Sequence, residues 1–479
     1  MYSDNGTTFT VAYSHTNQSG RVKVACAPSS AYTLYAVFEA SGKVDTLIRT
    51  HNKGKTWISV SKPKDADTGI PGTDPSRGQA WYDLSLAVSP LDTTVVMAGF
   101  VGVFQTQNKG LAWLQVGKWS NNSGLANLSC AYVHADIHTF TFKPGSTECL
   151  IGTDGGIFYA PDVMDNMSNQ AVIYEANNGF TVTQMYWGDI SQTKGKDLML
   201  AGAQDNGTNQ LATSGLCDEN MISGGDGGYC FISQTNDNKQ IVSYVYNQFY
   251  STTNNWTANA KIIDDATTGK FINPAVWDDL NGYLFTGKSK VTIYRNKLGT
   301  SATLATTVTV NGTAANGAPS AFCSSISSAG KTQLYVGTDV GKLYVTTDAV
   351  ASAPTWKDIT GSTGSAIPAG NISCIHRLRL SDTLFVTISN YGSTANILMS
   401  VDAGVTWTSR DGNIADMPIW AILVNPNKMG EAVIATELGV YGTSDIFASS
   451  VVWTPYNEGM GAVKTSTLRY RASDQTIMA

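Results

Sequence analysis

Apolar and polar positions along the chain form short runs that either alternate or stay apolar, and each run is closed by turn residues. Asp83–Val88, Thr94–Gly99 and Gly102–Thr106 are three such runs in immediate succession. Runs of this length and pattern are typical of short β-strands. The chain contains none of the long Ala/Glu/Lys/Leu stretches that helical solenoids and coiled coils require. The pattern therefore predicts an all-β protein.

One turn pattern recurs: an Asp or Asn, a Gly two residues later and an aromatic residue five residues later. The fullest copy is Ser400–Trp407, and further copies are Thr50–Trp57, Thr106–Trp113 and Asp4–Phe9. In a tight turn the Asp or Asn oxygen accepts backbone N–H groups and Gly supplies a positive φ. The aromatic residue then begins the next strand and packs between neighbouring sheets. This is the pattern of the Asp box, or bacterial neuraminidase repeat, and it predicts a β-propeller blade.

Weaker turns fall between these copies, and together they set the number of repeats. They lie near Asp162, Gln210, Tyr250, Asn296, Asp348 and Asp445. The spacing of about 50 residues matches a four-stranded blade, so residues 1–479 are expected to form about ten repeats. These repeats would make one large ring or parts of two propellers. Each end of the sequence falls within a blade, and we therefore expect a fragment of a longer chain.

Composition narrows the possible partners. Charged residues are only 14% of the chain and the net charge is −6, which argues against a nucleic-acid-binding surface. The sequence contains no apolar run of about 18 residues, so no transmembrane helix is predicted. The first residues do not resemble a signal peptide. The seven cysteines include no CxxC pair, so no zinc site is expected. Cys130 with Cys149, and Cys217 with Cys230, could form disulfides, but the preferred interpretation is buried thiols.

Candidate functional residues concentrate in residues 134–229. His134, Asp136 and His138 open the innermost strand of a blade, where alternate residues would share one face. Asp154 lies in a Thr-Asp-Gly-Gly turn between the second and third strands of that blade. The next two repeats contribute Gln204, Asp205 and Asn206 from the equivalent turn, and Asp226 and Tyr229 from the start of an innermost strand. We expect these side chains to reach one opening, away from the Asp-box turns.

Several roles are open to these residues. Asp-Gly and Asn-Gly pairs are common in turns without any function, and the two histidines could simply line a channel. As carboxyl groups, Asp154, Asp226 and Asp136 could act as acid and base in glycoside hydrolysis. His134, His138, Gln204, Asp205, Asn206 and Tyr229 are suited to hydrogen bonding and stacking on a sugar. No further Glu or His accompanies the two histidines, so neither a metal nor a cofactor is predicted.

The order of these motifs resembles that of a known group. Asp boxes followed by HADIH, TDGG, QDNGT and GGDGGY are similar to secreted bacterial BNR-repeat, glycosyl-hydrolase-like propellers, and the likeness covers most of the chain. That group is similar to xyloglucanase-type hydrolases, which implies two seven-bladed propellers and two aspartates, here matched by Asp154 and Asp226. Sortilin-type receptors, with a single ring of ten blades, also resemble it. The group also implies a sorting or adhesion module beyond Ala479.

The distribution of arginines argues against a sialidase, another class of protein with Asp-box turns. Sialidases share the Asp box but need three arginines for the substrate carboxylate, and no arginine lies between Arg77 and Arg295. The sequence thus predicts an extracellular or cell-surface propeller that recognises a glycan or another extracellular polymer. The alternatives are a glycoside hydrolase of the xyloglucanase type and a structural or peptide-binding propeller without catalytic aspartates.

Overall fold

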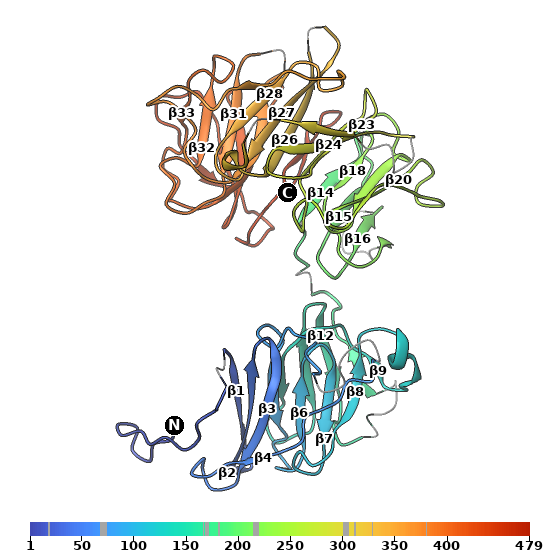
Figure 1. Cartoon of the computed structure of the whole chain (residues 1–479), viewed down its shortest axis with the longest axis vertical. Coiled ribbons are helices and arrows are strands. Elements are labelled where there is room, and N and C mark those ends of the chain that lie inside the picture. The colour runs from blue at the N-terminus through green and yellow to red at the C-terminus, as the bar shows by residue number, and fades with distance from the viewer. Residues whose placement is uncertain are drawn as a thin grey trace. The chain divides into compact units, whose positions relative to one another are not determined.

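The chain consists almost entirely of β-strands in two compact units, residues 1–183 and 184–479 (Figure 1). The computed structural model describes all residues except 18–19, 68–73, 166, 168–171, 181–182, 214–219, 300–305, 311–312, 328 and 380. The 3₁₀ helices in the described residues include η1 (Ser123–Asn127) and η4 (Ala314–Asn316). Among these residues no helix has the length and apolarity needed to cross a bilayer.

The first unit contains three sheets among its described residues, in each of which consecutive strands are neighbours. These sheets comprise β1 (Val22–Ala27), β2 (Ser30–Ala40), β3 (Lys43–Thr50) and β4 (Ile58–Ser59); β5 (Ser85–Val88), β6 (Val96–Gly99), β7 (Val103–Thr106), β8 (Leu114–Lys118) and β9 (Ala131–Tyr132); and β10 (Ile137–Phe142), β11 (Cys149–Thr153), β12 (Gly156–Ala160) and β13 (Tyr174–Glu175). All pairs are antiparallel except β8 and β9, which run parallel.

The second unit contains six four-stranded sheets and one two-stranded sheet in its described part. The first three sheets comprise β14 (Trp187–Ile190), β15 (Met199–Gly202), β16 (Thr208–Leu211) and β17 (Asn220–Ser223); β18 (Cys230–Ile232), β19 (Gln240–Ser243), β20 (Asn247–Thr252) and β21 (Ala260–Asp265); and β22 (Ala275–Asp278), β23 (Tyr283–Gly287), β24 (Thr292–Lys297) and β25 (Thr306–Thr309). The next three comprise β26 (Pro319–Ile326), β27 (Thr332–Thr338), β28 (Leu343–Thr346) and β29 (Lys357–Asp358); β30 (Ile372–Arg377), β31 (Leu384–Ile388), β32 (Ile397–Ser400) and β33 (Thr408–Ser409); and β34 (Ile419–Val424), β35 (Ala432–Thr436), β36 (Gly439–Thr443) and β37 (Thr454–Pro455). The two-stranded sheet consists of β38 (Arg469–Arg471) and β39 (Thr476–Met478).

The seven sheets of the second unit surround one central cavity of about 410 Å³. The first strand of every sheet lines it, from β14 through β18, β22, β26, β30 and β34 to β38. This arrangement confirms the all-β propeller and the predicted innermost position of each first strand. The ten sheets described in the chain match the predicted number of repeats, divided three and seven between the units.

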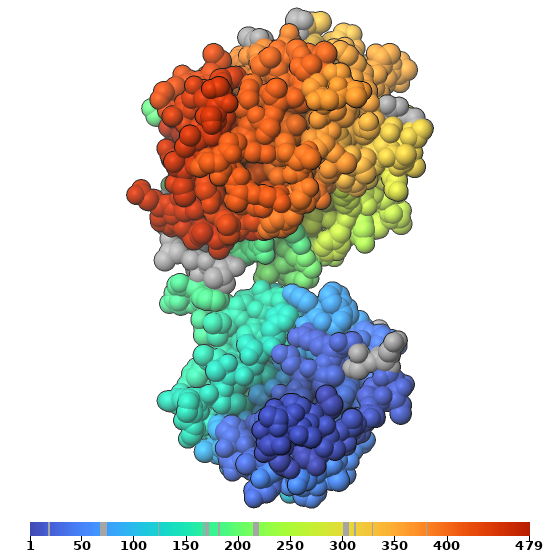
Figure 2. All heavy atoms as spheres, turned by 90° about the vertical axis from the view of Figure 1, so that its left-hand side faces the viewer, coloured from blue at the N-terminus to red at the C-terminus, as the bar shows by residue number. Residues whose placement is uncertain are grey.

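The last sheet of the second unit is held against its first. Ser466 Oγ donates to the carbonyl oxygens of Met185 (3.2 Å) and Tyr186 (3.0 Å), just before β14. Within β38 itself, the carbonyl oxygen of Tyr470 accepts from Gln192 Nε2 at 3.1 Å. These bonds join residues about 280 positions apart and close the ring. Figure 2 shows the late residues of this unit, in red, on one face.

The repeated turns join the third strand of a sheet to its fourth, as predicted. In the fullest copy, Asp402 Oδ1 accepts the N–H groups of Val405 (3.1 Å) and Thr406 (2.9 Å), while Ser400 Oγ accepts that of Gly404. Trp407 is 3% exposed, and its Nε1 donates to the carbonyl oxygen of Ile359 in the preceding sheet. Gly404 has φ 86°, and a Cβ there would lie 2.7 Å from Cβ of Ile359. This turn therefore fastens its sheet to the previous one.

Two other copies depart from the pattern. In residues 4–9 it is Asn5, and not Asp4, whose Oδ1 accepts the N–H groups of Thr7 and Thr8, each at 2.9 Å. The weak turn expected near Tyr250 has the full hydrogen bonding: Asn254 Oδ1 accepts from Ala258 N. There Trp256 occupies the glycine position with φ 66°. The turn geometry thus tolerates substitutions that hide it in the sequence.

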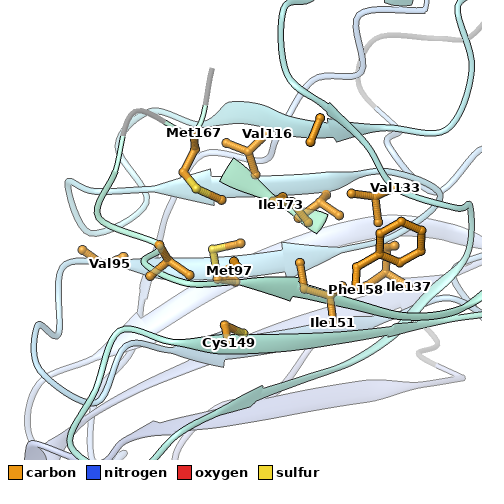
Figure 3. Close-up of a cluster of buried hydrophobic side chains, with 14 residues drawn as sticks. Val95, Met97, Val116, Val133, Ile137, Cys149, Ile151, Phe158, Met167 and Ile173 are labelled. Carbon is orange, nitrogen blue, oxygen red and sulfur yellow. The ribbon is translucent and has the colours of Figure 1, made fainter. Parts of the chain in front are cut away.

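The core of the first unit shows how the sheets pack. Val95, Met97 and Val116 of the second sheet meet Ile151 and Phe158 of the third, and all are buried (Figure 3). Cys149 lies in the same cluster. Cys149 and Cys130 are free, buried thiols, which confirms the interpretation preferred from the sequence. Cys217 lies outside the described residues.

Candidate functional site

A polar cluster in the first unit forms around the Asp154 turn. Asp154 lies in the tight turn between β11 and β12, as predicted, and Thr153 Oγ1 braces it by accepting the N–H of Gly155 and donating to the carbonyl oxygen of Gly156. Gly156 has φ 113°, which favours glycine. The turn therefore presents the Asp154 carboxylate at the edge of the sheet.

Two side chains from other segments hold this carboxylate. His138 Nε2 lies 2.5 Å from Asp154 Oδ1, and the Tyr82 hydroxyl donates to both carboxylate oxygens, at 3.0 and 2.9 Å. The Tyr82 ring meets the His138 ring edge-on, with the centroids 4.9 Å apart. The charged acceptor is thus fixed in direction by a phenol and an imidazole.

An exposed aromatic residue stands beside this group. Trp81 is 65% exposed, and its ring centroid lies 5.6 Å from that of Tyr82. A large apolar ring open to solvent carries an energetic penalty that burial against a ligand would remove. Trp81 therefore supplies a free stacking surface next to the fixed carboxylate.

A second pair of carboxyl groups lies deeper in the same unit. Asp136 is 7% exposed and accepts a hydrogen bond of 2.6 Å from Gln79 Nε2, which also donates to Asp83 at 3.2 Å. Asp83 is fully buried. Burial, reinforced by the negative charge of Asp136, raises the pKa of Asp83 to about 9. At neutral pH Asp83 is therefore a protonated acid beneath the site, where no solute can contact it.

The expected alternation of His134, Asp136 and His138 along one strand face is wrong. β10 begins only at Ile137, Asp136 has φ 64°, and the pairing of β10 with β11 shifts register between Ile137 and Thr139. The side chains consequently diverge, and Asp136 turns inward. The His134 ring instead packs against Gly155, so closely that a Cβ on Gly155 would lie 2.2 Å from His134 Cγ. Both histidines nevertheless border the Asp154 turn.

In the second unit, two glycine-rich loops pack backbone against backbone. Gly207 N donates to Gly225 O at 2.7 Å, and Gly227 N donates to Ala203 O at 2.8 Å. A Cβ at Gly227 would lie 2.1 Å from the Gly207 carbonyl oxygen, and one at Gly202 would lie 2.3 Å from that of Gly228. The repeated glycines are therefore required by this contact, which joins the turn after β15 to the segment before β18.

This contact gathers the predicted polar groups of the second unit. Asp226 Oδ1 accepts the backbone N–H of Asp205 at 3.1 Å, Tyr186 OH donates to Gln204 Oε1 at 2.5 Å, and Asn206 Nδ2 donates to the Gln204 carbonyl oxygen. Gln204 and Asp205 are exposed. Burial, together with the charges of Asp226 and Asp205, raises the pKa of Tyr186 and also that of Tyr244. The loops form an acidic and amide-rich rim beside two protonated phenols.

Tyr229 is placed differently from the other predicted residues. It lines the central cavity of the second unit and stacks on Trp187, with the ring centroids 4.1 Å apart. The residues predicted to reach one opening belong to two different units. His134, His138 and Asp154 lie in the first, and Gln204, Asp205, Asn206 and Asp226 lie in the second. Asp154 and Asp226, matched above to a two-domain enzyme, are divided between the units.

Sequence reasoning missed Trp81, Tyr82, Gln79 and Asp83. The available signal was positional, because this segment precedes the first strand of its sheet, β5, as residues 134–136 precede β10. Tyr244 was also missed. Within either unit taken alone, no three described His, Cys, Asp or Glu side chains converge as ligands of a metal ion would.

Comparisons with known proteins found structural likenesses only. No family model and no curated protein sequence matches the chain. The GH74 enzyme of Niastella koreensis is 14% identical, the match covering 91% of this chain and 78% of that one with a TM-score of 0.32. The GH74 xyloglucanase from Xanthomonas campestris is 15% identical over 91% and 66%, with a TM-score of 0.22. Chaetomium thermophilum Raptor is 10% identical over 60% and 26%, with a TM-score of 0.44. All three scores are below 0.5, and the fold assignment rests on the strand order.

Proposed function

We propose that this chain is an extracellular, Asp-box propeller protein that recognises a glycan through the loops at the ends of its innermost strands. The supporting observation is the group in the first unit, where exposed Trp81 stands beside an Asp154 carboxylate held by Tyr82 and His138. Sugars present apolar C–H faces and a rim of hydroxyl groups. A free indole ring and an oriented acceptor match these two features.

The loops of the second unit supply the same chemistry in another form. Gln204, Asp205 and Asn206 offer amide and carboxylate groups at an exposed turn, and Tyr186 lies against them. A polymeric ligand suits such a protein, because several weak contacts along one chain add up through effective concentration. Secretion by a bacterium and a sorting or adhesion module after residue 479 belong to the same proposal.

Glycan-array binding by the full chain tests this function. We expect Asp154→Asn and Trp81→Ala to weaken binding about tenfold or more, since each removes a direct contact. Trp81→Phe should retain part of the affinity, and Asp165→Asn, at an exposed turn of the same sheet, should retain all of it. Unchanged melting temperatures would show that the variants are folded. If Asp154→Asn and Trp81→Ala bind every glycan as the wild type does, the proposed site is wrong, and a structural or peptide-binding propeller becomes the better interpretation.

Glycoside hydrolysis is a second candidate, favoured by the oriented carboxylates of Asp154 in the first unit and Asp226 in the second. The xyloglucanase resemblance implies one catalytic aspartate in each of two propellers. Asp136 is 7% exposed, and this candidate therefore depends on the other two carboxyl groups. Incubation with xyloglucan and β-glucan oligosaccharides should release new reducing ends that disappear in Asp154→Asn and in Asp226→Asn. If the chain binds these oligosaccharides and releases no new reducing ends, glycan recognition without hydrolysis is the better interpretation.

A further inference from the structure

The central cavity of the second unit is separate from the loops proposed to recognise glycan. Its volume of about 410 Å³ falls within the range of small-molecule sites. Aromatic side chains from five sheets line it: Trp187, Tyr229, Trp277, Phe322 and Trp420. Gln204, Asp205, Asn206 and Asp226 do not contribute to its walls. The cavity is therefore an aromatic-walled chamber with polar groups of its own.

Arg469 on β38 brings the first of these polar groups. Its guanidinium lies over the Trp187 ring, 4.2 Å from the centroid. Its Nε lies 3.4 Å from Asp189 Oδ1, and Nη1 donates to the Leu468 carbonyl oxygen at 3.4 Å. Within the described part of the chain, Nη2 has no hydrogen-bond partner. Arg469 is thus held in place by stacking while part of its hydrogen-bonding capacity is unused.

Two further donors on the cavity wall are unused in the same way. Among the described residues, neither the Tyr229 hydroxyl nor the His376 ring makes a hydrogen bond. Burial raises the pKa of Tyr229, so its hydroxyl keeps its proton. Burial also lowers the pKa of His376 to about 4, so the neutral ring offers one N–H. The three groups come from β38, from the residue preceding β18, and from β30.

The two carboxylates on the cavity wall, by contrast, already have hydrogen-bond donors. Asp189 accepts the backbone N–H groups of Ile190 (3.1 Å) and Ile232 (2.8 Å) in addition to its contact with Arg469. Asp279 accepts from Ser233 Oγ at 2.7 Å and from Gln234 N at 2.8 Å. The unused donors therefore are not paired with these carboxylates, and a ligand that accepts hydrogen bonds would satisfy them.

We propose that the central cavity binds a small organic carboxylate whose ring packs against the aromatic walls and whose oxygens accept from Arg469, Tyr229 and His376. A carboxylate offers two oxygens with about four acceptor positions, which is enough for the three donors on the cavity wall. An acidic sugar and an aromatic acid share this chemistry. The site is independent of glycan recognition at the loops, because it uses none of their residues.

Calorimetric titration of the full chain tests the proposal with two matched pairs of probes. Glucuronate is compared with glucose, and benzoate with benzyl alcohol. We expect at least one acid to bind with a Kd below about 1 mM, and its neutral counterpart to bind about tenfold more weakly or not at all. Binding by glucuronate alone would identify an acidic sugar, and binding by benzoate alone an aromatic acid.

Substitutions then locate the binding. Arg469→Gln should weaken the binding of the acid about 10- to 100-fold. Arg379→Gln, the same replacement at an exposed residue of this unit, should have no effect. Tyr229→Phe keeps the ring stack and should lose about three- to tenfold, which provides a test if Arg469→Gln fails to fold. The proposal is overturned if neither acid binds at about 10 mM, or if the folded variants bind as the wild type does. The glycan-array variants at Asp154 and Trp81 should leave this binding unchanged.

Discussion

Each unit fixes a carboxylate at or beside a turn between second and third strands, but by different means. In the first unit, the side chains of Tyr82 and His138 reach Asp154 from outside its turn. In the second unit, Asp226 is fixed by a backbone N–H, that of Asp205, and by loops pressed together through glycine. Side-chain fixation can be altered one donor at a time. Backbone packing leaves no atom that can move without shifting a whole loop.

The largest expected difference concerns the glycines. In Gly227→Ala the new Cβ would meet the Gly207 carbonyl oxygen at 2.1 Å, and we expect unfolding to become easier by about 3 kcal/mol or more. In Gly155→Ala the nearest atoms belong to the His134 side chain, with Cγ at 2.2 Å and Cβ at 2.7 Å. Rotation of the ring relieves the first contact, and a small shift of the backbone relieves the second. That variant should lose about 1 kcal/mol. Denaturant unfolding of both variants measures the difference, and equal losses would contradict it.

The next largest effect is a pair of opposite pH dependences. Asp83 has a folded-state pKa of about 9 against an ordinary 3.8, so the folded chain retains a proton that the unfolded chain releases between these values. The free energy of unfolding should therefore fall as the pH rises from about 4 to 9. The contribution of Asp83 is fully present below the ordinary pKa of an aspartate.

His376 in the second unit should show the reverse sign. Its folded-state pKa is about 4 against 6.5, so the unfolded chain takes up a proton first as the pH falls. The free energy of unfolding should drop between about pH 6.5 and 4. Unfolding curves of Asp83→Asn and His376→Gln, each subtracted from the wild type at several pH values, separate the two effects. A difference that does not vary with pH would refute the corresponding assignment.

The smallest effect concerns the phenols beside the two turns. Tyr82→Phe removes a hydroxyl that donates to both oxygens of Asp154, and glycan affinity should fall about fivefold with little change in melting temperature. Tyr186→Phe removes a hydrogen bond to the neutral Gln204 amide, and its effect should be about half as large in free energy. Measured glycan affinities of the two variants test this order. A larger loss in Tyr186→Phe than in Tyr82→Phe would show that the second unit contributes more to recognition.

Local chemistry explains what could be predicted from the sequence. The Ser400–Trp407 turn and the Thr-Asp-Gly-Gly turn depend on hydrogen bonds within a few residues, so their residue types identify them. Short apolar runs likewise predicted strands that pair with their neighbours along the chain. The number of sheets follows from the same local signals.

Packing between distant segments explains what was missed. Asp136 alternates with His134 and His138 in the sequence, but a positive φ and a register shift send its side chain toward Gln79. Tyr82 lies 72 residues from Asp154, and no local pattern links the two. The division of ten sheets into three and seven likewise depends on how whole sheets meet, which single-strand patterns do not contain.

The closure of the seven-sheet ring has a consequence for biosynthesis. Its first and last sheets are joined by hydrogen bonds between residues such as Ser466 and Met185, 281 positions apart. A ribosome adding about 5–20 residues per second needs roughly 15 to 55 s to make that stretch. During this interval β14 lacks β38, the strand that packs beside it in the closed ring. Nascent chains of the second unit should accordingly depend on protection by chaperones for longer than those of the first.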